Sequence, residues 1–353
     1  MRPILPIPVL VAWTVIVCGG AYAVTTCSGA ATATASASQH DLVALKERFR
    51  RPEQVPFPKA NPLTPEKVTL GKALFFDPRL SSSGSVSCAT CHNPSLGWSD
   101  GLTRAVGFGM VSLPRRTPPV RNLAWGTAFQ WDGRADSLEA QARMPITAPD
   151  EMNMSMDLVV ERLKAISGYA ALFRDAFGGE EPIGARHVTA ALATFQRTLV
   201  SDEAPFDRWA SGEESAIGAD AKRGFALFAG KAGCAACHST WRFTDDSFHD
   251  IGLKASDDLG RGKFAPPNVT AMRYAFKTPS LRDLRMQGPY MHDGQLGSLD
   301  AVLDHYIKGG ERRSSLSFEM KPFEMSERER RDLIAFLETL KAEPIAITLP
   351  QLP

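Results

Sequence analysis

The chain of 353 residues carries 40 Lys and Arg against 39 Asp and Glu. This net charge of +1 excludes a strong overall electrostatic attraction to nucleic acid or anionic membranes. Hydrophobic residues make up 44% of the sequence, which is typical of globular proteins and excludes wholesale disorder. The six cysteines are too few for a disulfide scaffold. The length predicts about two domains, and we expect no nucleic-acid partner.

The N-terminal 23 residues, 1–23, have the pattern of a secretory signal peptide. One arginine precedes an apolar run over residues 4–17, and small residues follow up to an Ala-Tyr-Ala sequence that ends at Ala23. The run is shorter than ~18 clean apolar residues and contains prolines, which favours cleavage over a membrane anchor. Residues 24–40 are rich in Ala, Ser and Thr and predict a flexible low-complexity linker. We expect a periplasmic protein with no stable membrane span after signal cleavage.

Four of the cysteines form two C-x-x-C-H motifs. The motifs are Cys88-Ala89-Thr90-Cys91-His92 and Cys234-Ala235-Ala236-Cys237-His238. Two thiols at this spacing can form thioethers with the two vinyl groups of one haem, and the adjacent histidine can then bind the iron. One copy could be a redox-active cysteine pair, whereas two copies in an exported chain favour haem. We predict two covalently bound haem c groups, with His92 and His238 as iron ligands.

A helical segment precedes each motif. Residues 71–75 (GKALF) lead into the first motif, and residues 224–228 (GFALF) lead into the second. A helix before a haem loop is typical of a class I cytochrome c unit. We therefore predict a mainly α fold in which two cytochrome c-like haem domains, residues 41–215 and 216–353, pack together with long loops. Further helices are predicted around residues 159–166, 192–199 and 326–340, the last opened by a capping box of Ser326 and Glu329.

Histidines are scarce, which limits the possible axial ligands. No histidine occurs between His92 and Trp131, so we expect the first haem to keep one open face, with Met110 as a competing ligand. A haem with an open face can bind and split a small molecule, whereas a haem with two protein ligands moves electrons. The chain is thus either an enzyme or a non-catalytic di-haem electron-transfer protein.

Further motifs recur in order around both haem sites. They are Phe129–Ala135, Gln141, Pro145 and Pro149–Met152 in the first half, and His249–Gly252, Lys277–Arg282 and Gly288–Gly294 in the second. This arrangement resembles the bacterial di-haem cytochrome c peroxidases and the related MauG enzymes. The resemblance extends over roughly residues 60–342, nearly the whole mature chain.

The resemblance implies that residues 41–215 form the peroxidatic domain and that the C-terminal domain transfers electrons. It implies that Glu151 is the distal acid and base, with Gln141 beside it and Pro145 packed over the haem. A carboxyl group near iron can move a proton from the inner to the outer peroxide oxygen. Trp131 matches a tryptophan that lies between the haems and can relay charge, and it can also serve as a core aromatic residue.

The sixth ligand of the second haem separates the subgroups of the family. The position that holds methionine in the peroxidases falls on Tyr306, and MauG-like enzymes have tyrosine there. A phenolate is a hard anionic donor that stabilises high-valent iron better than a thioether does. The alternative ligands are His305, Met291, Met320 and Met325.

One position departs from the family. An asparagine that helps to hold calcium commonly precedes the Thr-Pro of the first domain, but this chain has Arg116 there, and Gln287 replaces a common threonine. A guanidinium could supply the positive charge itself, so the sequence leaves open whether calcium binds here.

The resemblance implies an oxidoreductase that uses hydrogen peroxide to form a high-valent di-haem state. In the MauG-like alternative, that state oxidises a Trp or Tyr residue of a partner protein, and Tyr306 favours this version. In the peroxidase alternative, a small cytochrome or cupredoxin donates the electrons and peroxide is reduced to water.

Overall fold

The computed structural model describes residues 42–180, 182–254, 256–344 and 346–353. The chain divides into a unit of residues 1–44 and a unit of residues 45–353, and the second unit contains both C-x-x-C-H motifs. The predicted signal peptide and the predicted linker fall outside the described residues. Within the described ranges, every helix is too short or too polar to cross a membrane.

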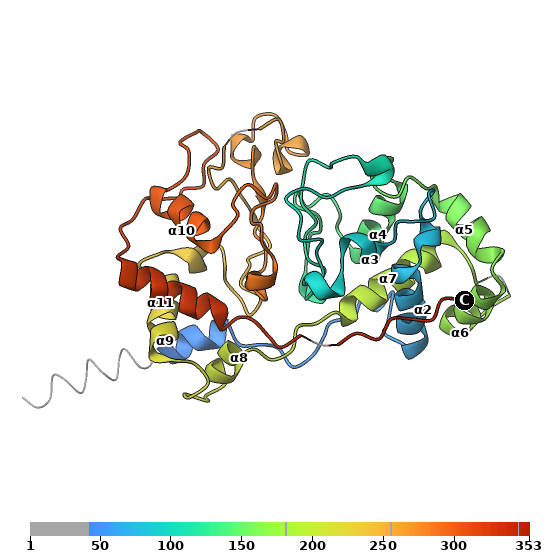
Figure 1. Ribbon diagram of the computed structural model, residues 1–353, viewed down its shortest axis with the longest axis horizontal. Coiled ribbons are helices and arrows are strands. Elements are labelled where there is room, and N and C mark those ends of the chain that lie inside the picture. The colour runs from blue at the N-terminus through green and yellow to red at the C-terminus, as the bar shows by residue number, and fades with distance from the viewer. Residues whose placement is uncertain (1–41, 181, 255, 345) are drawn as a thin grey trace, which may run out of the picture. The chain divides into compact units, whose positions relative to one another are not determined.

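The larger unit is mainly helical, as predicted (Figure 1). Its α-helices include α2 (Pro65–Phe76), α3 (Cys88–Cys91), α4 (Leu138–Thr147), α5 (Met156–Lys164), α6 (Ser167–Phe177), α7 (Ala185–Thr198), α8 (Pro205–Ala210), α9 (Ala219–Ala229), α10 (Leu299–Lys308) and α11 (Glu327–Glu338). Two short strands, β1 (Phe248–His249) and β2 (Phe276–Lys277), pair antiparallel, with Phe248 opposite Lys277. Long loops with short 3-10 turns connect these elements, so the loops rather than a sheet surround the haem motifs.

The helix before the first haem motif packs closely on a later helix. In α2, a Cβ added to Gly71 would lie 2.0 Å from the carbonyl oxygen of Ala191 in α7, so only glycine permits this approach. Leu70, Leu74 and Leu192 are fully buried around the crossing. The hydroxyl of the N-cap residue Thr64 accepts a hydrogen bond that starts α2.

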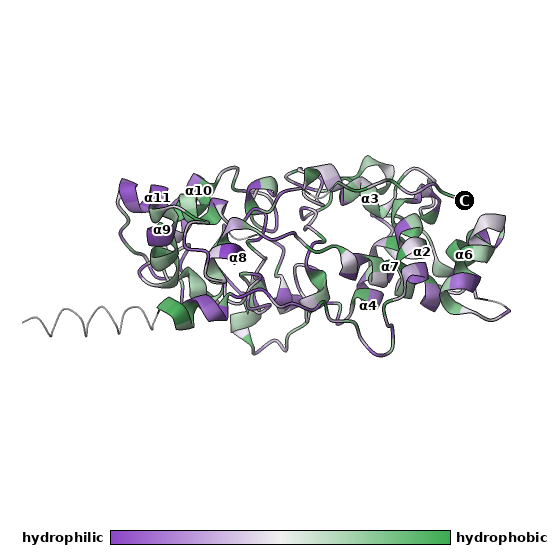
Figure 2. Ribbon diagram, turned by 90° about the horizontal axis from the view of Figure 1, so that it is seen from below, coloured by the Kyte–Doolittle hydropathy of each residue, from purple (hydrophilic) through white to green (hydrophobic). Residues whose placement is uncertain are grey.

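The helix before the second motif repeats this arrangement. A Cβ at Gly224 of α9 would lie 1.9 Å from the carbonyl oxygen of Asp332 in α11, and Figure 1 shows these two helices side by side. The predicted capping box of Ser326 and Glu329 is confirmed at the start of α11. Figure 2 shows hydrophilic residues at the start of α11, whereas Leu333 and its apolar neighbours are buried.

Two hydrophobic cores lie behind these helix pairs, and each contains residues from both predicted domains. Phe49, Phe206 and Trp209 pack into the core that contains Phe225 and Phe336. These three residues precede the predicted domain boundary at residue 215. In the opposite direction, the C-terminal residues Ile347 and Leu352 pack against the core built around α2 and α7. Segments from both sides of residue 215 therefore contribute to each core.

Candidate active site

A cavity of about 640 Å³ adjoins the first C-x-x-C-H motif. The wall of this first cavity includes Cys88, Cys91, His92, Trp131, Gln141, Pro145 and Glu151. The structure therefore brings together all the residues predicted for the first haem site, although they come from three separate segments. Met110, the competing ligand, does not line the cavity and is 83% exposed.

The two motif histidines are oriented in the same way. The Nδ1 atom of His92 lies 3.2 Å from the carbonyl oxygen of Trp98, and that of His238 lies 2.9 Å from the carbonyl oxygen of Phe243. A carbonyl only accepts, so Nδ1 carries the proton and Nε2 remains free to bind a metal. Burial lowers the pKa of both imidazoles, which keeps them neutral. Such a backbone partner is what orients metal-binding histidines in other proteins.

Glu151 lies in the turn after α4, and a neighbouring loop supports this turn. A Cβ at Gly107 would lie 1.9 Å from the carbonyl oxygen of Asp150, and the Phe108 amide donates to that oxygen at 3.0 Å. Burial raises the pKa of Glu151, the Asp150 carboxylate raises it further, and Arg134 opposes both effects. The carboxyl group can therefore hold a proton at a higher pH than an exposed glutamate does.

Helix α4 presents Gln141 and Pro145 to the first cavity. The two residues are four positions apart and so lie on one face of the helix. Ser137 caps the helix, since its hydroxyl accepts a hydrogen bond from the Ala140 amide at 3.2 Å. Neither glutamine nor proline is a usual ligand of haem iron.

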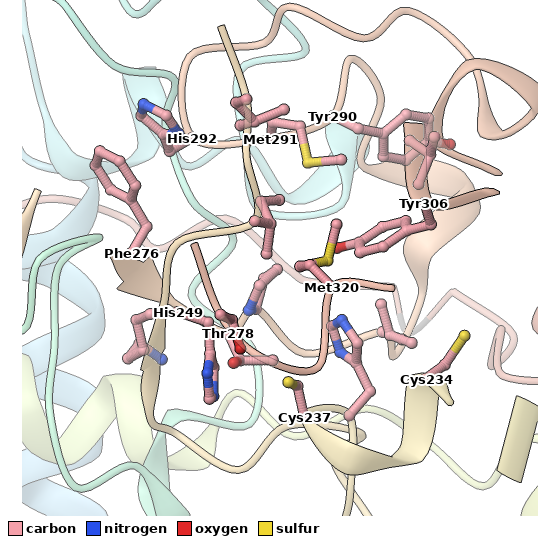
Figure 3. A pocket seen from close by; sticks show the side chains of 18 of the residues that line it. Cys234, Cys237, His249, Phe276, Thr278, Tyr290, Met291, His292, Tyr306 and Met320 are labelled. Atoms are coloured by element: carbon pink, nitrogen blue, oxygen red, sulfur yellow. The ribbon is translucent and has the colours of Figure 1, made fainter. Parts of the chain in front are cut away.

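A second cavity of about 200 Å³ adjoins the other motif. Cys234, Cys237, His238 and Tyr306 line it. In Figure 3 the phenol oxygen of Tyr306 points toward the sulfur of Met320, and the two cysteines lie below it. Burial strongly raises the pKa of Tyr306, and the two thiols add to the effect. The phenol is therefore neutral unless a cation such as iron stabilises its anion.

The alternative ligands of the second haem are placed differently. His305 and Met325 do not line the second cavity, and Nε2 of His305 lies 2.8 Å from the carbonyl oxygen of Ile251. Met291 and Met320 do line the second cavity. In Figure 3 their sulfur atoms lie above the two cysteines, as the Tyr306 ring does. The structure thus leaves these two methionines beside Tyr306 as side chains near the motif.

Trp131 lines both cavities. Its indole nitrogen donates to the carbonyl oxygen of Arg116 at 3.0 Å, and its own carbonyl accepts from the Lys277 amide at 2.8 Å. The ring of His292, from the corresponding loop of the second half, lies 6.4 Å away between centroids. Trp131 thus belongs to both cavity walls, and it also packs in the interior, since it is only 8% exposed.

The structure also reveals charged residues to which the sequence assigned no role. Lys277 lies in both cavity walls, although it occurred in a motif used only for family resemblance. His249 pairs with Asp245 at 2.8 Å, and this pairing, with the Cys237 thiol, raises the pKa of His249 to about 10. Among the described residues, the one cluster with metal-ligand spacing consists of Cys237, Asp245 and His249. Cys237 belongs to the haem motif, so the cluster is not a separate metal site.

The position at which related proteins commonly hold a calcium ligand carries the cation Arg116. Arg116 is 4% exposed, and within the described ranges its Nε atom has no hydrogen-bond partner. The amide nitrogen of Gln287 donates to the carbonyl oxygen of Arg282 at 2.7 Å. Calcium requires several oxygen ligands, and a buried guanidinium repels a divalent cation. These residues therefore do not fit calcium, and we assign it no step.

Comparisons with known proteins identify similar sequences and folds. The family described as di-haem cytochrome c peroxidase matches residues 65–215. The methylamine utilization protein MauG of Methylorubrum extorquens is 91% identical over 353 residues, which cover all of both chains. The protein of the same name from Methylophilus methylotrophus is 55% identical over 310 residues, or 87% of this chain and 92% of the relative.

One solved structure shows a similar fold over most of the chain. It is that of a MauG-like protein associated with microbial copper homeostasis, with a TM-score of 0.77 and 29% identity. The alignment covers 83% of this chain and 95% of the other.

Proposed function

Because this chain belongs to the family of di-haem cytochrome c peroxidases and MauG proteins, we propose that it covalently holds two haem c groups and uses hydrogen peroxide to oxidise a partner protein. The chain is a peroxide-dependent di-haem oxidoreductase, like its relatives. The proposal adds the mode of attachment, the roles of individual residues and the kind of substrate.

The residues present fit two c-type haems. Each cavity lies beside a pair of free thiols and one neutral histidine whose Nε2 is available. Arg116 lines both cavities, and its buried Nε atom has no hydrogen-bond partner among the described residues. An anionic cofactor could supply that partner. The glycine-mediated helix pairs α2–α7 and α9–α11 support two cytochrome c-like units. When bound, the haems supply iron that reacts with peroxide and stores oxidising equivalents.

At the first site, Glu151 acts on the proton of the peroxide. Its carboxylate accepts the proton from the inner oxygen and delivers it to the outer oxygen, which then leaves as water. Gln141, on the adjacent face of α4, orients the peroxide by hydrogen bonding. Pro145 fills the same side without offering a ligand, so this position stays open for peroxide.

At the second site, His238 and Tyr306 would hold the iron, and a haem with two protein ligands would transfer electrons. Trp131 lies in both walls and carries charge between the two sites. The observation that carries this proposal is the asymmetry between the cavities, because a tyrosine reaches into one where a proline lies in the other.

The partner is inferred from the relatives. Both MauG relatives are described as methylamine utilization proteins, so we place the substrate protein of this chain in methylamine utilization and in the periplasm. Each peroxide takes up two electrons and two protons to form two waters. In our proposal a Trp or Tyr residue of the partner supplies those electrons and is itself oxidised.

A second candidate function is reduction of peroxide to water with electrons from a small cytochrome or cupredoxin. The presence of Met291 and Met320 in the second cavity favours it, because a thioether ligand at this site is the peroxidase arrangement.

The deciding experiment mixes the fully oxidised protein with hydrogen peroxide in a stopped-flow spectrometer, without prior reduction. We expect a rapid spectral change that lasts until an electron donor is added. Proteins encoded beside its gene are then added, and mass spectrometry is expected to find an oxidised Trp or Tyr peptide in one of them.

Other outcomes distinguish the alternatives. A reaction that occurs only after prior reduction of one haem supports the peroxidase and contradicts the MauG-like version. Two low-spin haems that never react with peroxide support the non-catalytic electron-transfer protein.

A further inference from the structure

Two cations, Arg116 and Lys277, line both cavities. Each is held beside Trp131 through the backbone, because the Trp131 indole bonds to the carbonyl of Arg116 and the Trp131 carbonyl bonds to the amide of Lys277. These bonds hold the backbone of both residues at the wall that the two cavities share. The proton transfer at Glu151 uses neither charge.

The guanidinium of Arg116 has spare hydrogen-bonding capacity. Its Nε atom lacks a partner, and its Nη2 atom lies 3.4 Å from the hydroxyl of Ser99, near the limit for a hydrogen bond. Arg116 forms no ion pair with the described residues, and it is 4% exposed. Burial lowers the pKa of this guanidinium, and Asp100 partly opposes the effect. A buried charge without a partner is costly, so a ligand at this position stabilises the site.

The ammonium of Lys277 has only a shared counter-ion. Its Nζ atom lies 3.2 Å from Oδ1 of Asp246, and the same carboxylate is paired with Arg242. The side chains of Lys277 and Asp246 are 15% and 7% exposed. Arg242 and Lys277 thus share Asp246, while the nearby Asp245, which also favours the charged ammonium, is itself paired with His249. Burial lowers the pKa of Lys277, and Asp246 opposes this.

The remaining buried cations of these walls pair with carboxylates that no second buried cation uses, although Asp132 also pairs with Arg134 and Asp258 with Lys263. Arg115 pairs with Asp132 and Asp258, Arg121 pairs with Asp283, and Arg282 pairs with Asp207. Arg134 and Lys263 are more exposed and reach water. Within the described part of the chain, the buried positive charge that lacks an equal negative charge is therefore concentrated at Arg116 and Lys277.

We propose that Arg116 and Lys277 form a carboxylate-binding pair that holds propionate groups of the haems at the wall between the two cavities. This inference rests on the proposed haem attachment. Haem is anionic at the edge that carries its two propionates, and guanidinium and ammonium groups are the usual partners of carboxylates. The pair anchors the anionic edge of each haem next to Trp131, and it neutralises charge that the protein leaves unpaired.

The test uses the haem-loaded protein and compares Arg116→Met and Lys277→Met with the wild type. Arg116→Lys keeps the charge, and Lys222→Met is the matched control because it removes one partly exposed cation that pairs with Glu214 outside both cavity walls. Three quantities are measured for each protein. They are the covalent haem content after denaturation, the propionate bending modes in resonance Raman spectra, and the midpoint potentials of both haems.

Loss of either buried cation is expected to shift the propionate modes and to favour ferric iron. We expect at least a tenfold change in the reduction equilibrium, equivalent to about 59 mV for one electron. Arg116→Lys should lie closer to the wild type than Arg116→Met, and the control should match the wild type. The result should be the same in chloride and in acetate buffers, because an exchangeable anion in place of a propionate would respond to the buffer.

Unchanged Raman modes and potentials in both methionine variants, with normal haem content, would overturn this inference alone. A buffer-dependent shift would also overturn it, in favour of a free anion. If the wild type carried no covalent haem, both this inference and the proposed function would fail. Should Arg116→Met not accumulate, Lys277→Met decides by the same criteria.

Discussion

Pro145 and Tyr306 occupy the same position in two equivalent helices. Each is the eighth residue of a ten-residue helix, Pro145 in α4 and Tyr306 in α10. Both helices begin after a capping serine, Ser137 or Ser298, whose hydroxyl accepts from the amide three residues later. Each of the two residues lines the cavity of its own haem motif. One structural template thus places a side chain without a ligand atom at one site and a phenol at the other.

Replacing Tyr306 by Phe is expected to open the second site. The variant loses the oxygen that we propose as a ligand, so the resting ferric spectrum should gain a high-spin component from the second haem. Electronic absorption and electron paramagnetic resonance spectra measure this change. The control is Tyr290→Phe, which removes a phenol from the same cavity wall. An unchanged spectrum in Tyr306→Phe would show that Met291 or Met320 is the ligand.

Local motifs made much of this site predictable from the sequence. Each C-x-x-C-H motif consists of five consecutive residues. The helices around Gly71 and Gly224 follow from short periodic segments, so both features depend only on residues that are close in the sequence. The roles of Glu151 and Trp131 came from family resemblance instead. The structure adds that both line the same cavity as His92, which no local pattern could establish.

Features that depend on long-range packing were not predictable. Phe49 and Ile347 pack into cores that lie far from them in the sequence, because each core is completed by whichever apolar segment the fold brings near. The lack of a partner at Arg116 is likewise a property of its surroundings. The sequence showed an arginine at an unusual position, but only the packing shows that its Nε atom is buried without a hydrogen bond.

Replacing Glu151 by Gln should slow peroxide cleavage while both haems stay attached. An amide cannot accept and return the proton, so the rate constant for reaction with peroxide should fall by roughly 10²–10⁴-fold. Stopped-flow measurement under excess peroxide gives this constant. Glu161→Gln is the matched control, since Glu161 is exposed on α5 outside the cavity walls. Equal rates in the wild type and Glu151→Gln would remove Glu151 from the mechanism.

The pH profile of this reaction should report the raised pKa of Glu151. The carboxylate must be ionised to accept the proton, so the rate should fall as the pH decreases through a pKa above the ordinary value of 4.5. Asp150→Asn removes a negative neighbour, which lowers the pKa of Glu151 and moves the acidic limb to lower pH. Arg134→Met removes a positive neighbour and should move it to higher pH. If the acidic limb moved in the same direction in both variants, this electrostatic assignment would be contradicted.

Removal of calcium is expected to leave the enzyme unchanged. Arg116 places a buried positive charge where the family commonly has a calcium ligand, so the position is already cationic. Dialysis against a calcium chelator should therefore alter neither the haem spectra nor the reaction with peroxide. Elemental analysis of the purified protein provides the independent measurement. Loss of activity that returns on adding calcium would show that the ion binds despite the guanidinium.

Replacing Trp131 by Phe should separate the redox behaviour of the two sites. Phenylalanine fills most of the space but is far harder to oxidise than indole, and it cannot donate to the carbonyl oxygen of Arg116. We expect peroxide still to react at the first site, whereas oxidation of the second site becomes slow. Rapid-mixing spectroscopy that resolves the two haems follows both steps. Because Trp131 is buried, the variant should also lose about 0.5–3 kcal/mol of stability.

That loss of stability is controlled with Trp209→Phe. Trp209 is 1% exposed in the core of the second haem half and lines neither cavity, so its replacement removes a similar volume without touching the shared wall. If Trp131 relays charge, only Trp131→Phe slows electron transfer between the two sites, although both variants unfold at a lower temperature. Equal slowing in the two variants would mean that packing disorder is the cause, and normal exchange in Trp131→Phe would exclude the indole from the pathway.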